Sequence, residues 1–560
     1  MRMPTTAGSG PAGRDGPADG TAGDRSGRPD RPRRSPGAAA AVLARRHWLI
    51  ALLLLAGLVL RALSVAAYQP ALLYIDSLKY LFGAWPGNDP LGYNVILKVL
   101  LAGGNLDTVT VVQHLAGLAM AAGLYVLLLR RGTPRWLAAL AAAPVLLDAY
   151  QIQIEQTIMP DVWFEALIVA GLMLLLWRPE PGPWRTAAGG LALGASAPIA
   201  QVGQILIVPA LVYLLIVVPG WRRKLVHAVV LCAAFALPIV GFSLREYVVA
   251  RQFSLAPAAG STIYGRLAES ADCATLNLPS YERAVCPPRA LAIRLGPDGL
   301  VHSTLSPDHT YVAPPGRSHS EVVGNFEHQV ITQQPLRVVG GVLGDAARLF
   351  ELHRVTSTGD TPISRWQFQT SYPTYGSSIF LSRDHTIMLG LHFAASGGPV
   401  QVRPLPATMG GQATVDRPPA AFLRGYQLHG GYTPGPLLLL ATLAGLAGTV
   451  IALAGGLASA RGRGFLSPGQ RQLALACLLV FGSAVAVLLA SDLFEFSWRY
   501  QLPALVTLSP AGALGLALLG SLLRRRAAPA HPKGRNGIVP GSSSAPAGGE
   551  QPDSRPHPAS

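Results

Sequence analysis

The feature that most constrains this chain is a series of apolar runs, each close to the length that a helix needs to cross a lipid bilayer. That length is about 20 residues, and half of the chain is hydrophobic while only 13% is charged. The expected spans are 47–67, 108–129, 136–152, 161–178, 186–200, 202–220, 225–244, 435–458, 470–491 and 502–523. The sequence therefore predicts a polytopic all-α membrane protein with about ten transmembrane helices, or fewer if 186–200 and 202–220 form one re-entrant unit.

Clusters of Lys and Arg flank these runs and indicate their orientation. Cytoplasmic loops of membrane proteins are enriched in Lys and Arg, and ten spans with a cytoplasmic N-terminus would place six clusters on that side. The clusters are Arg45–Arg46, Arg130–Arg131 with Arg135, Arg178 with Arg185, Arg222–Lys224, Arg461 and Arg463 with Arg471, and Arg524–Arg526. We therefore expect a multi-pass protein of the cell membrane with both termini in the cytoplasm. The same clusters account for the formal charge of +16, so nucleic acid is not an expected partner.

Polarity divides the chain into five parts. Residues 1–44 and 526–560 are rich in small residues, Pro and Arg and are predicted to be disordered cytoplasmic tails, with a composition typical of high-GC actinobacterial proteins. Residues 45–245 hold the first seven predicted spans, and residues 435–525 hold the last three. Between them, residues 246–434 are predicted to form one extracytoplasmic domain of mixed α/β structure.

The segment 246–434 has two features of its own. Apolar residues recur at helical spacing near 321–353, which predicts an amphipathic helical stretch. Cys273 and Cys286 both lie in this polar segment, where an oxidising exterior favours a disulfide between them. The two other cysteines lie within apolar runs and are expected to be core residues.

The first outer loop carries an isolated carboxylate. Asp76 follows Tyr74 and precedes Lys79 and Tyr80. An aspartate in apolar, aromatic surroundings can act as a general base if those surroundings tune its pKa. The alternative is that Asp76 only caps a short interfacial helix, and the sequence does not decide between the two.

The second outer loop carries further carboxylates. Asp161 follows Pro160 where a span is predicted to begin, so helix capping and the helix dipole explain it as well as a functional role does. Glu155 has no such explanation, and Glu165 lies one turn into the predicted helix. Asp76 and the acids of the second loop are a candidate acid/base or substrate-orienting set.

Several positive charges are expected on the outer side, against the usual charge bias of membrane proteins, so each needs a partner. They are Arg61 at the end of the first span, Lys79 and Lys98 in the first loop, Arg245 after the seventh span and Arg499 before the last. The phosphate or pyrophosphate of an anionic lipid would be a natural partner. The alternative for Arg499 is a local ion pair with Asp492 or Glu495.

These motifs resemble the GT-C superfamily of membrane glycosyltransferases, which includes the protein mannosyltransferase and aminoarabinose transferase groups. The matching features are the aromatic-flanked Asp76, the Pro160-Asp161 pair, a large outer domain after seven spans, and Arg499-Tyr500-x-x-Pro503. The resemblance covers both membrane segments and not the outer domain. The chain departs from it where Ser77, rather than a second acid, follows Asp76, and where Gln201 and Gln204 stand in place of an Arg.

The resemblance implies roles for these residues. Asp76 would be the base that deprotonates the acceptor, and Asp161, with Glu155, would orient donor or acceptor. Arg499 would hold the carrier phosphate. The other expected substrate contacts are Lys79, Tyr80, Arg61, Tyr500 and Arg245.

The implied activity is that of an inverting glycosyltransferase. It would move a sugar from a polyprenyl-phosphate carrier in the membrane lipid to a cell-envelope acceptor (a glycan, lipid or protein) on the outer face. No further cofactor is implied with certainty, although a divalent metal is compatible with the acids. Two other interpretations stay open, namely a transporter or flippase for lipid-linked solutes and a non-catalytic envelope-assembly protein.

Overall fold

The computed structural model describes residues 45–85, 90–256, 263–393, 399–460 and 464–527. The chain divides into two units, residues 1–48 and 49–560, and the arrangement below is that of the second unit. Both predicted tails lie almost wholly outside the described residues.

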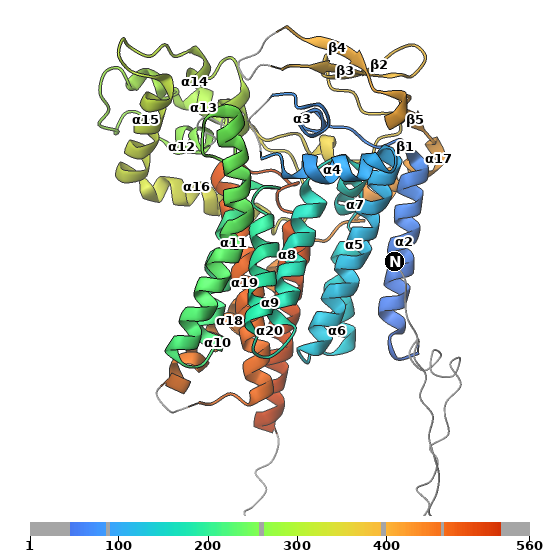
Figure 1. Cartoon of the computed structure of the whole chain (residues 1–560), viewed down its shortest axis with the longest axis vertical. Coiled ribbons are helices and arrows are strands. Elements are labelled where there is room, and N and C mark those ends of the chain that lie inside the picture. The colour runs from blue at the N-terminus through green and yellow to red at the C-terminus, as the bar shows by residue number, and fades with distance from the viewer. Residues whose placement is uncertain (1–44, 86–89, 257–262, 394–398, 461–463, 528–560) are drawn as a thin grey trace, which may run out of the picture. The chain divides into compact units, whose positions relative to one another are not determined.

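Long helices run side by side along one direction (Figure 1). The first group is α2 (Trp48–Ala67), α5 (Leu106–Arg130), α6 (Arg135–Leu147), α8 (Asp161–Leu176), α9 (Pro183–Ala195), α10 (Ile207–Val217) and α11 (Trp221–Ala250). The short helix α7 (Ala149–Gln156) follows α6, and the 3₁₀ turn η1 (Gln201–Leu206) precedes α10. The last group is α18 (Gly435–Ala460), α19 (Pro468–Phe494) and α20 (Pro503–Ala527). The shorter elements lie at the upper end of these helices in Figure 1.

Six of the described helices, α2, α5, α11, α18, α19 and α20, are long and apolar enough to cross a membrane. A seventh is counted if α6 and α7, which meet at a bend of 48°, form one span. The other expected spans fall on α8, α9 and α10, which have 16, 13 and 11 residues, fewer than the roughly 20 that a bilayer requires. The long apolar helices therefore support a membrane protein, while the expected count of ten spans is not confirmed.

A fixed bend interrupts the apolar run that was expected to be one span at 136–152. Pro144 lies inside α6 and removes a helical hydrogen bond. Four residues later Asp148 is extended and caps α7 by accepting a hydrogen bond of 3.0 Å from the backbone N–H of Tyr150. Arg354 forms an ion pair of 2.8 Å with Asp148. The bend is thus stabilised by a charged contact from a segment that follows α11.

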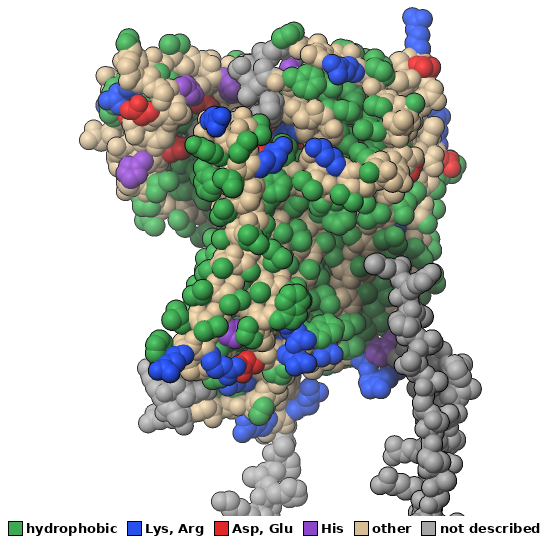
Figure 2. All heavy atoms as spheres, viewed as in Figure 1, with side chains coloured by type: hydrophobic (Ala, Val, Ile, Leu, Met, Phe, Trp, Pro, Cys, Tyr) green, Lys and Arg blue, Asp and Glu red, His purple; other side chains and the backbone are tan. Residues whose placement is uncertain are grey.

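Basic clusters meet at the lower end of the helices. The Arg131 side chain donates to the backbone carbonyl of Arg178 at 2.6 Å, and Arg223 pairs with Glu180. Figure 2 shows Lys and Arg gathered at this end, while hydrophobic side chains cover the middle of the face. An apolar belt bordered by a basic end is what the charge bias of membrane proteins predicts.

Small residues allow two pairs of helices to approach closely. Gly194 of α9 lies against the backbone of Phe235 in α11, and Gly515 of α20 lies against the backbone of Ala444 in α18. A side chain at either glycine would collide with that backbone, so these positions require Gly. Close backbone approach at Gly and Ala is a usual way for helices to associate in lipid.

The loop between α2 and α5 contains β1 (Tyr68–Gln69), α3 (Ser77–Phe82) and α4 (Gly92–Ala102). Strand β1 pairs in antiparallel fashion with β5 (Thr414–Val415), in the register Tyr68 to Val415. The first loop is thereby tied to a segment almost 350 residues further along the chain.

A helical lobe follows α11. It contains α12 (Tyr264–Ser270), η2 (Arg283–Val285), α13 (Arg289–His302), α14 (Pro307–Thr310), α15 (His319–Gln333) and α16 (Pro335–Arg348). Buried side chains including Tyr264, Leu267, Phe326 and Val330 form its own core. The helices α15 and α16 fall within the amphipathic stretch expected near 321–353.

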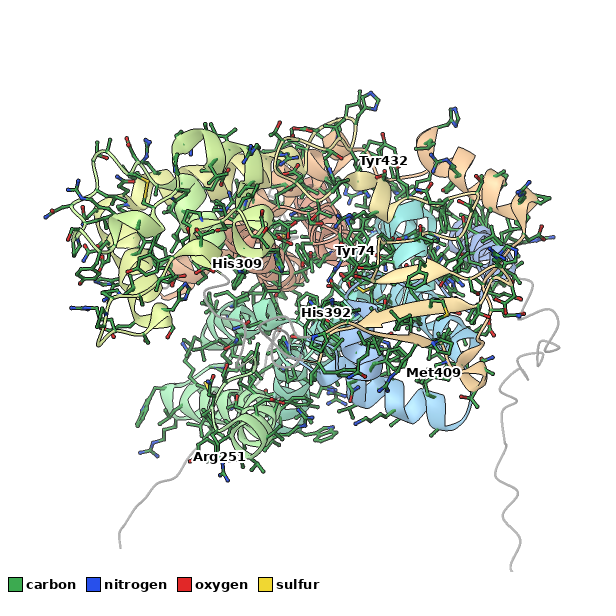
Figure 3. The ribbon with its side chains drawn as sticks, turned by 90° about the horizontal axis from the view of Figure 1, so that it is seen from above. Tyr74, Arg251, His309, His392, Met409 and Tyr432 are labelled. Carbon is green, nitrogen blue, oxygen red and sulfur yellow. A yellow bond between two sulfur atoms is a disulfide. The ribbon has the colours of Figure 1, made fainter. Side chains whose placement is uncertain are left out.

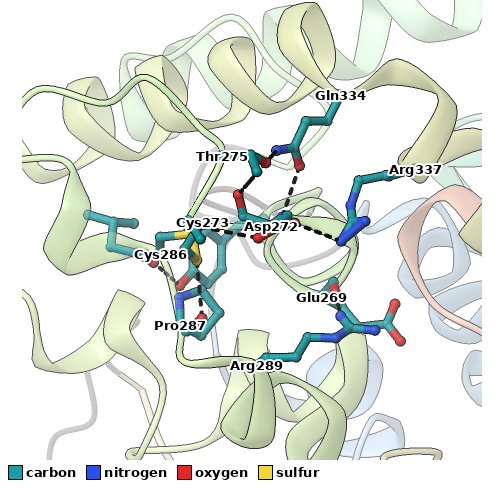
Figure 4. The surroundings of a disulfide bond; sticks show 12 residues. Glu269, Asp272, Cys273, Thr275, Cys286, Pro287, Arg289, Gln334 and Arg337 are labelled. Atoms are coloured by element: carbon teal, nitrogen blue, oxygen red, sulfur yellow. Dashed lines mark hydrogen bonds and ion pairs between the residues drawn. A yellow bond between two sulfur atoms is a disulfide. The ribbon is translucent and has the colours of Figure 1, made fainter.

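A disulfide joins Cys273 to Cys286 in this lobe, closing a loop of 13 positions (Figure 4). Beside it, Asp272 forms an ion pair of 3.3 Å with Arg337 of α16, and its backbone N–H donates to Gln334 at 2.9 Å. The loop is therefore fixed to α16 as well as to itself.

A second part of the segment carries strands. It contains η3 (Ile363–Trp366), β2 (Ile379–Leu381), β3 (Ile387–Leu391), β4 (Gln401–Pro404), η4 (Ala407–Met409), β5 and α17 (Arg417–Leu428). Strands β2, β3 and β4 form an antiparallel sheet in that order. Buried residues of the sheet, such as Ile379 and Leu389, join the main core that also contains the first loop. This part therefore packs directly on the loop that holds Asp76.

Topology can be tested with single cysteines in intact cells. We expect Val312→Cys, which replaces a side chain that is 85% exposed in the helical lobe, to react with a membrane-impermeant maleimide added outside. Lys533→Cys in the C-terminal tail should react only after permeabilisation. The parent chain, which keeps Cys232 and Cys477, gives the background. Labelling of Lys533→Cys in intact cells would contradict the orientation.

Candidate functional site

Three residues from distant parts of the chain meet at one point. The Arg499 Nη1 atom lies 3.1 Å from Asp76 Oδ2, and its Nε atom donates to Asp161 Oδ1 at 2.9 Å. Lys79 Nζ lies 3.1 Å from the other oxygen of Asp76. We call Asp76, Lys79, Asp161 and Arg499 the Arg499 cluster.

Hydrogen bonds between the loop that follows α2 and the loop between α7 and α8 fix the position of Asp76. The Ser77 hydroxyl donates to the Ile158 carbonyl at 2.8 Å and accepts from the Tyr74 backbone N–H at 2.9 Å. Backbone bonds of 3.0 Å join Leu72 to the second loop at both Gln156 and Ile158. Ser77, which occupies the place of an expected second acid, therefore holds the loop of Asp76 beside the start of α8.

The capping alternative does not account for Asp76. The residue precedes α3, but its side chain makes no capping hydrogen bond. Asp161 is the first residue of α8, where the helix dipole favours a negative charge. Its Oδ2 atom is buried and has no hydrogen-bond partner among the described residues. A role at the start of a helix therefore does not by itself explain the position of either carboxylate.

Arg499 lies between α19 and α20, with 8% of its side chain exposed. Its guanidinium lies over the Tyr500 ring at 4.8 Å and the Trp366 ring at 5.3 Å. Its ion pairs among the described residues are with Asp76 and Asp161. The local pairing expected as an alternative is thus not formed, and Asp492 instead accepts a hydrogen bond from Gln501.

The charges of the Arg499 cluster stabilise one another. Burial by itself would raise the pKa of Asp76, but Lys79 and Arg499 outweigh it and hold that pKa well below its ordinary value. Burial would lower the pKa of Arg499, but Asp161 and the other negative groups nearby raise it above its ordinary value. Both shifts favour the charged forms of Asp76 and Arg499, so this ion pair is stabilised in the buried setting.

The segment after α16 covers the Arg499 cluster. Trp366 packs on Tyr74 with 4.7 Å between ring centres, and Arg365 donates to the Tyr74 hydroxyl at 2.7 Å. Figure 3 shows Tyr74 beside the strands of the sheet. A narrow hollow next to Arg499 is lined by Tyr150, Gln153, Ile154, Trp366, Trp498, Arg499 and Leu502. Trp366 could not be predicted from the sequence, because its contact with Arg499 joins positions 133 residues apart and leaves no local pattern.

Arg61 and Glu155 belong to a different network. The Arg61 Nε and Nη2 atoms each donate to a Glu155 oxygen at 2.7 Å, and both side chains are buried. Arg61 also donates to the carbonyls of Gly57, Val145 and Leu146, and His114 lies 2.9 Å from Glu155. The structure therefore pairs these residues with each other rather than with the Arg499 cluster, as a contact between α2 and α7.

The remaining expected site residues are split between the cluster and other regions. Tyr500 is in contact with Arg499, and Tyr80 is buried with its ring edge-on to Tyr93 at 5.4 Å. Arg245 lies in α11 and pairs with its neighbour Glu246. Among its described contacts, none reaches the Arg499 cluster.

The side chains around the Arg499 cluster bear on whether a metal ion could bind there. Within the described ranges, no group of three or more His, Cys, Asp or Glu side chains is arranged to hold a metal ion. The two carboxylates of the Arg499 cluster face Arg and Lys instead. These residues do not fit a metal held by three protein ligands, and no step below depends on one.

Comparison with known proteins gives one distant likeness. No protein-family model and no curated protein matches the chain. Among solved structures it is similar to the archaeal oligosaccharyltransferase AglB from Archaeoglobus fulgidus in complex with an inhibitory peptide and a dolichol-phosphate, with 13% identity and a TM-score of 0.36. The match covers 89% of this chain and 53% of that one, so this chain spans about half its length. At this identity and TM-score, the likeness does not identify the function of this chain.

The role of Glu155 can be tested by removing its charge. Glu155→Gln should lower stability by about 3–5 kcal/mol, because it leaves the buried Arg61 without a counterion. The control is Glu321→Gln, which breaks an exposed pair with Arg317 and should cost about 1 kcal/mol or less. Thermal unfolding of the purified variants measures both. Unchanged stability with lost transfer activity would instead support the substrate-binding role expected from the sequence.

Proposed function

We propose that the protein is a membrane glycosyltransferase that takes a sugar from a polyprenyl-phosphate carrier, with the Arg499 cluster as its active site. The observation that supports this most is the meeting of Asp76, Asp161 and Arg499 at one point. Asp76 and Asp161 come from separate loops and share the guanidinium of Arg499, so two acids and a cation stand where the reaction needs a base, an orienting group and a phosphate contact. The acceptor is a component of the cell envelope, and the site lies on the outer face of the membrane.

The chemistry requires few protein groups. The acceptor hydroxyl gives its proton to an Asp76 oxygen, and its oxygen attacks the anomeric carbon of the sugar. The bond between that carbon and the phosphate oxygen breaks, and its electron pair leaves with the polyprenyl phosphate. Attack opposite the leaving group inverts the anomeric carbon. Because the phosphate gains negative charge as the bond breaks, Arg499 and Lys79 stabilise the transition state more than the bound substrate.

Binding of the donor activates the base in this account. Without substrate, Lys79 and Arg499 hold the pKa of Asp76 low, which makes it a weak proton acceptor. A phosphate that draws Arg499 and Lys79 toward itself removes part of this stabilisation, so the pKa of Asp76 rises toward the range useful for a base. Asp161, which accepts from Arg499 Nε, keeps the guanidinium in place during this exchange.

Asp76→Asn tests the proton acceptor. The amide keeps the shape of the side chain but cannot take a proton, so transfer should fall by about 10²–10⁴-fold while folding is retained. The measurement is sugar transfer by purified protein from a polyprenyl-phosphate sugar, with thermal stability recorded alongside. Asp384→Asn, in the turn between β2 and β3, is the matched control and should keep its rate. Near-normal turnover in stable Asp76→Asn would reject Asp76 and favour Asp161 as the base.

Arg499→Lys tests the phosphate contact. Lysine keeps the positive charge, but its ammonium group lacks the planar set of N–H donors of a guanidinium. It therefore cannot contact both carboxylates and the phosphate at once. Loss of one charge-assisted hydrogen bond predicts a kcat/KM for the donor that is about tenfold to a hundredfold lower. Arg317→Lys on the helical lobe is the control. A donor kcat/KM equal to that of the parent in Arg499→Lys would show that the guanidinium does not contact the carrier.

A further inference from the structure

One face of helix α16 is apolar and uncovered. Leu336, Val339 and Leu343 are 83%, 50% and 53% exposed, and their spacing of three and four residues puts them on one side of the helix. Val338 and Val342 point the other way and are buried in the lobe. An exposed apolar stripe opposite a packed face marks a helix that meets a partner or a membrane surface.

The structure holds α16 at the ends of two membrane-spanning helices. Two residues beyond its end, the backbone of Phe350 and Glu351 lies against Gly435, the first residue of α18. On the other side, Asp345 of α16 pairs with Arg266. The Arg266 Nε atom also donates to the backbone carbonyl of Asp492, close to the end of α19, at 3.0 Å. These contacts place α16 at the height where the spans leave the membrane.

The exposed face of α16 is continuous with the apolar surface of the bundle. At the start of α18, Leu437, Leu440 and Leu443 are 56%, 60% and 53% exposed. Figure 1 shows α16 on the underside of the lobe, across the direction of the long helices. Figure 2 shows hydrophobic side chains on that underside and down the neighbouring helices. The stripe thus faces the region that lipid occupies around α18.

We propose that α16 is an amphipathic helix that lies on the surface of the membrane, in the leaflet nearer to the helical lobe. Its residues Leu336, Val339 and Leu343 insert at the boundary between headgroups and acyl chains. Helices with one apolar face lie in this plane because they bury that face in lipid while the other face stays polar or packed. The partner is a bilayer surface, and the claim does not depend on the proposed enzymatic activity.

Contact between α16 and the membrane leaflet would fix the position of the helical lobe relative to the Arg499 cluster. The chain runs from α16 through Arg354, which pairs with Asp148, to Trp366, which lies over Arg499. A helix seated on the membrane surface therefore holds one end of the segment that covers the site.

The test measures the surroundings of single spin labels in the full chain reconstituted into bilayers. Labels are placed at Leu336→Cys and Leu343→Cys, with Val312→Cys in the same lobe as the matched control, because Val312 is 85% exposed and lies outside α16. The background carries Cys232→Ser and Cys477→Ser, which leaves the Cys273–Cys286 disulfide intact. Collision with oxygen, which concentrates in lipid, is compared with collision with a water-soluble nickel chelate.

We expect the ratio of oxygen to nickel collisions to be several-fold higher at positions 336 and 343 than at position 312. Equal ratios at the three positions would overturn the proposal, since the face would then be in water. Low collision rates with both reagents at 336 and 343 would also overturn it, because the face would then be covered by protein, such as a second copy of the chain.

Discussion

The guanidinium of Arg499 is the contact on which the arrangement of the loops after α2 and α7 depends. Asp76 and Asp161 are largely withdrawn from water, and two such carboxylates repel each other unless a cation lies between them. Arg499 supplies that cation from the loop before the last long helix, and Lys79 shares the charge of Asp76. The first loop, the start of α8 and the entry to α20 are thereby held together at the point where we place the reaction.

A second buried pair, Arg61 with Glu155, has a different physical character. Glu155 receives both donors of Arg61 and lies against His114, so the charge is satisfied entirely within the protein. In the Arg499 cluster, by contrast, one oxygen of Asp161 has no hydrogen-bond partner among the described residues. The ring of Trp366, from the segment after α16, lies over Arg499. The two networks also differ in place, since Arg61 and Glu155 join two helices, whereas the Arg499 cluster lies where two loops meet beneath Trp366. This difference separates a structural pair from a candidate site.

Asp76, Asp161 and Arg499 stood out in the sequence as isolated charges, and the structure brings them together, while their roles stay predictions. The long apolar helices and the amphipathic stretch could be predicted from the sequence, because hydrophobic length and periodicity are local signals. The short helices α8, α9 and α10 could not, because an apolar run does not reveal where a helix ends within it. The carboxylate partners of Arg61 and Arg499 lie 94 to 423 positions away, and no local pattern marks Trp366. Long-range pairing of single charges depends on the fold rather than on any pattern near each residue.

The central claim is that the Arg499 cluster binds the phosphate of a polyprenyl carrier, and equilibrium binding tests it most directly. The measurement is the affinity of purified protein in nanodiscs for polyprenyl phosphate, compared between the parent, Arg499→Gln and the exposed-site control Arg317→Gln. The account predicts that Arg499→Gln weakens binding by about tenfold or more, since it removes a charge-assisted contact, and that the control binds as the parent does. Equal affinity of Arg499→Gln and the parent would contradict the account.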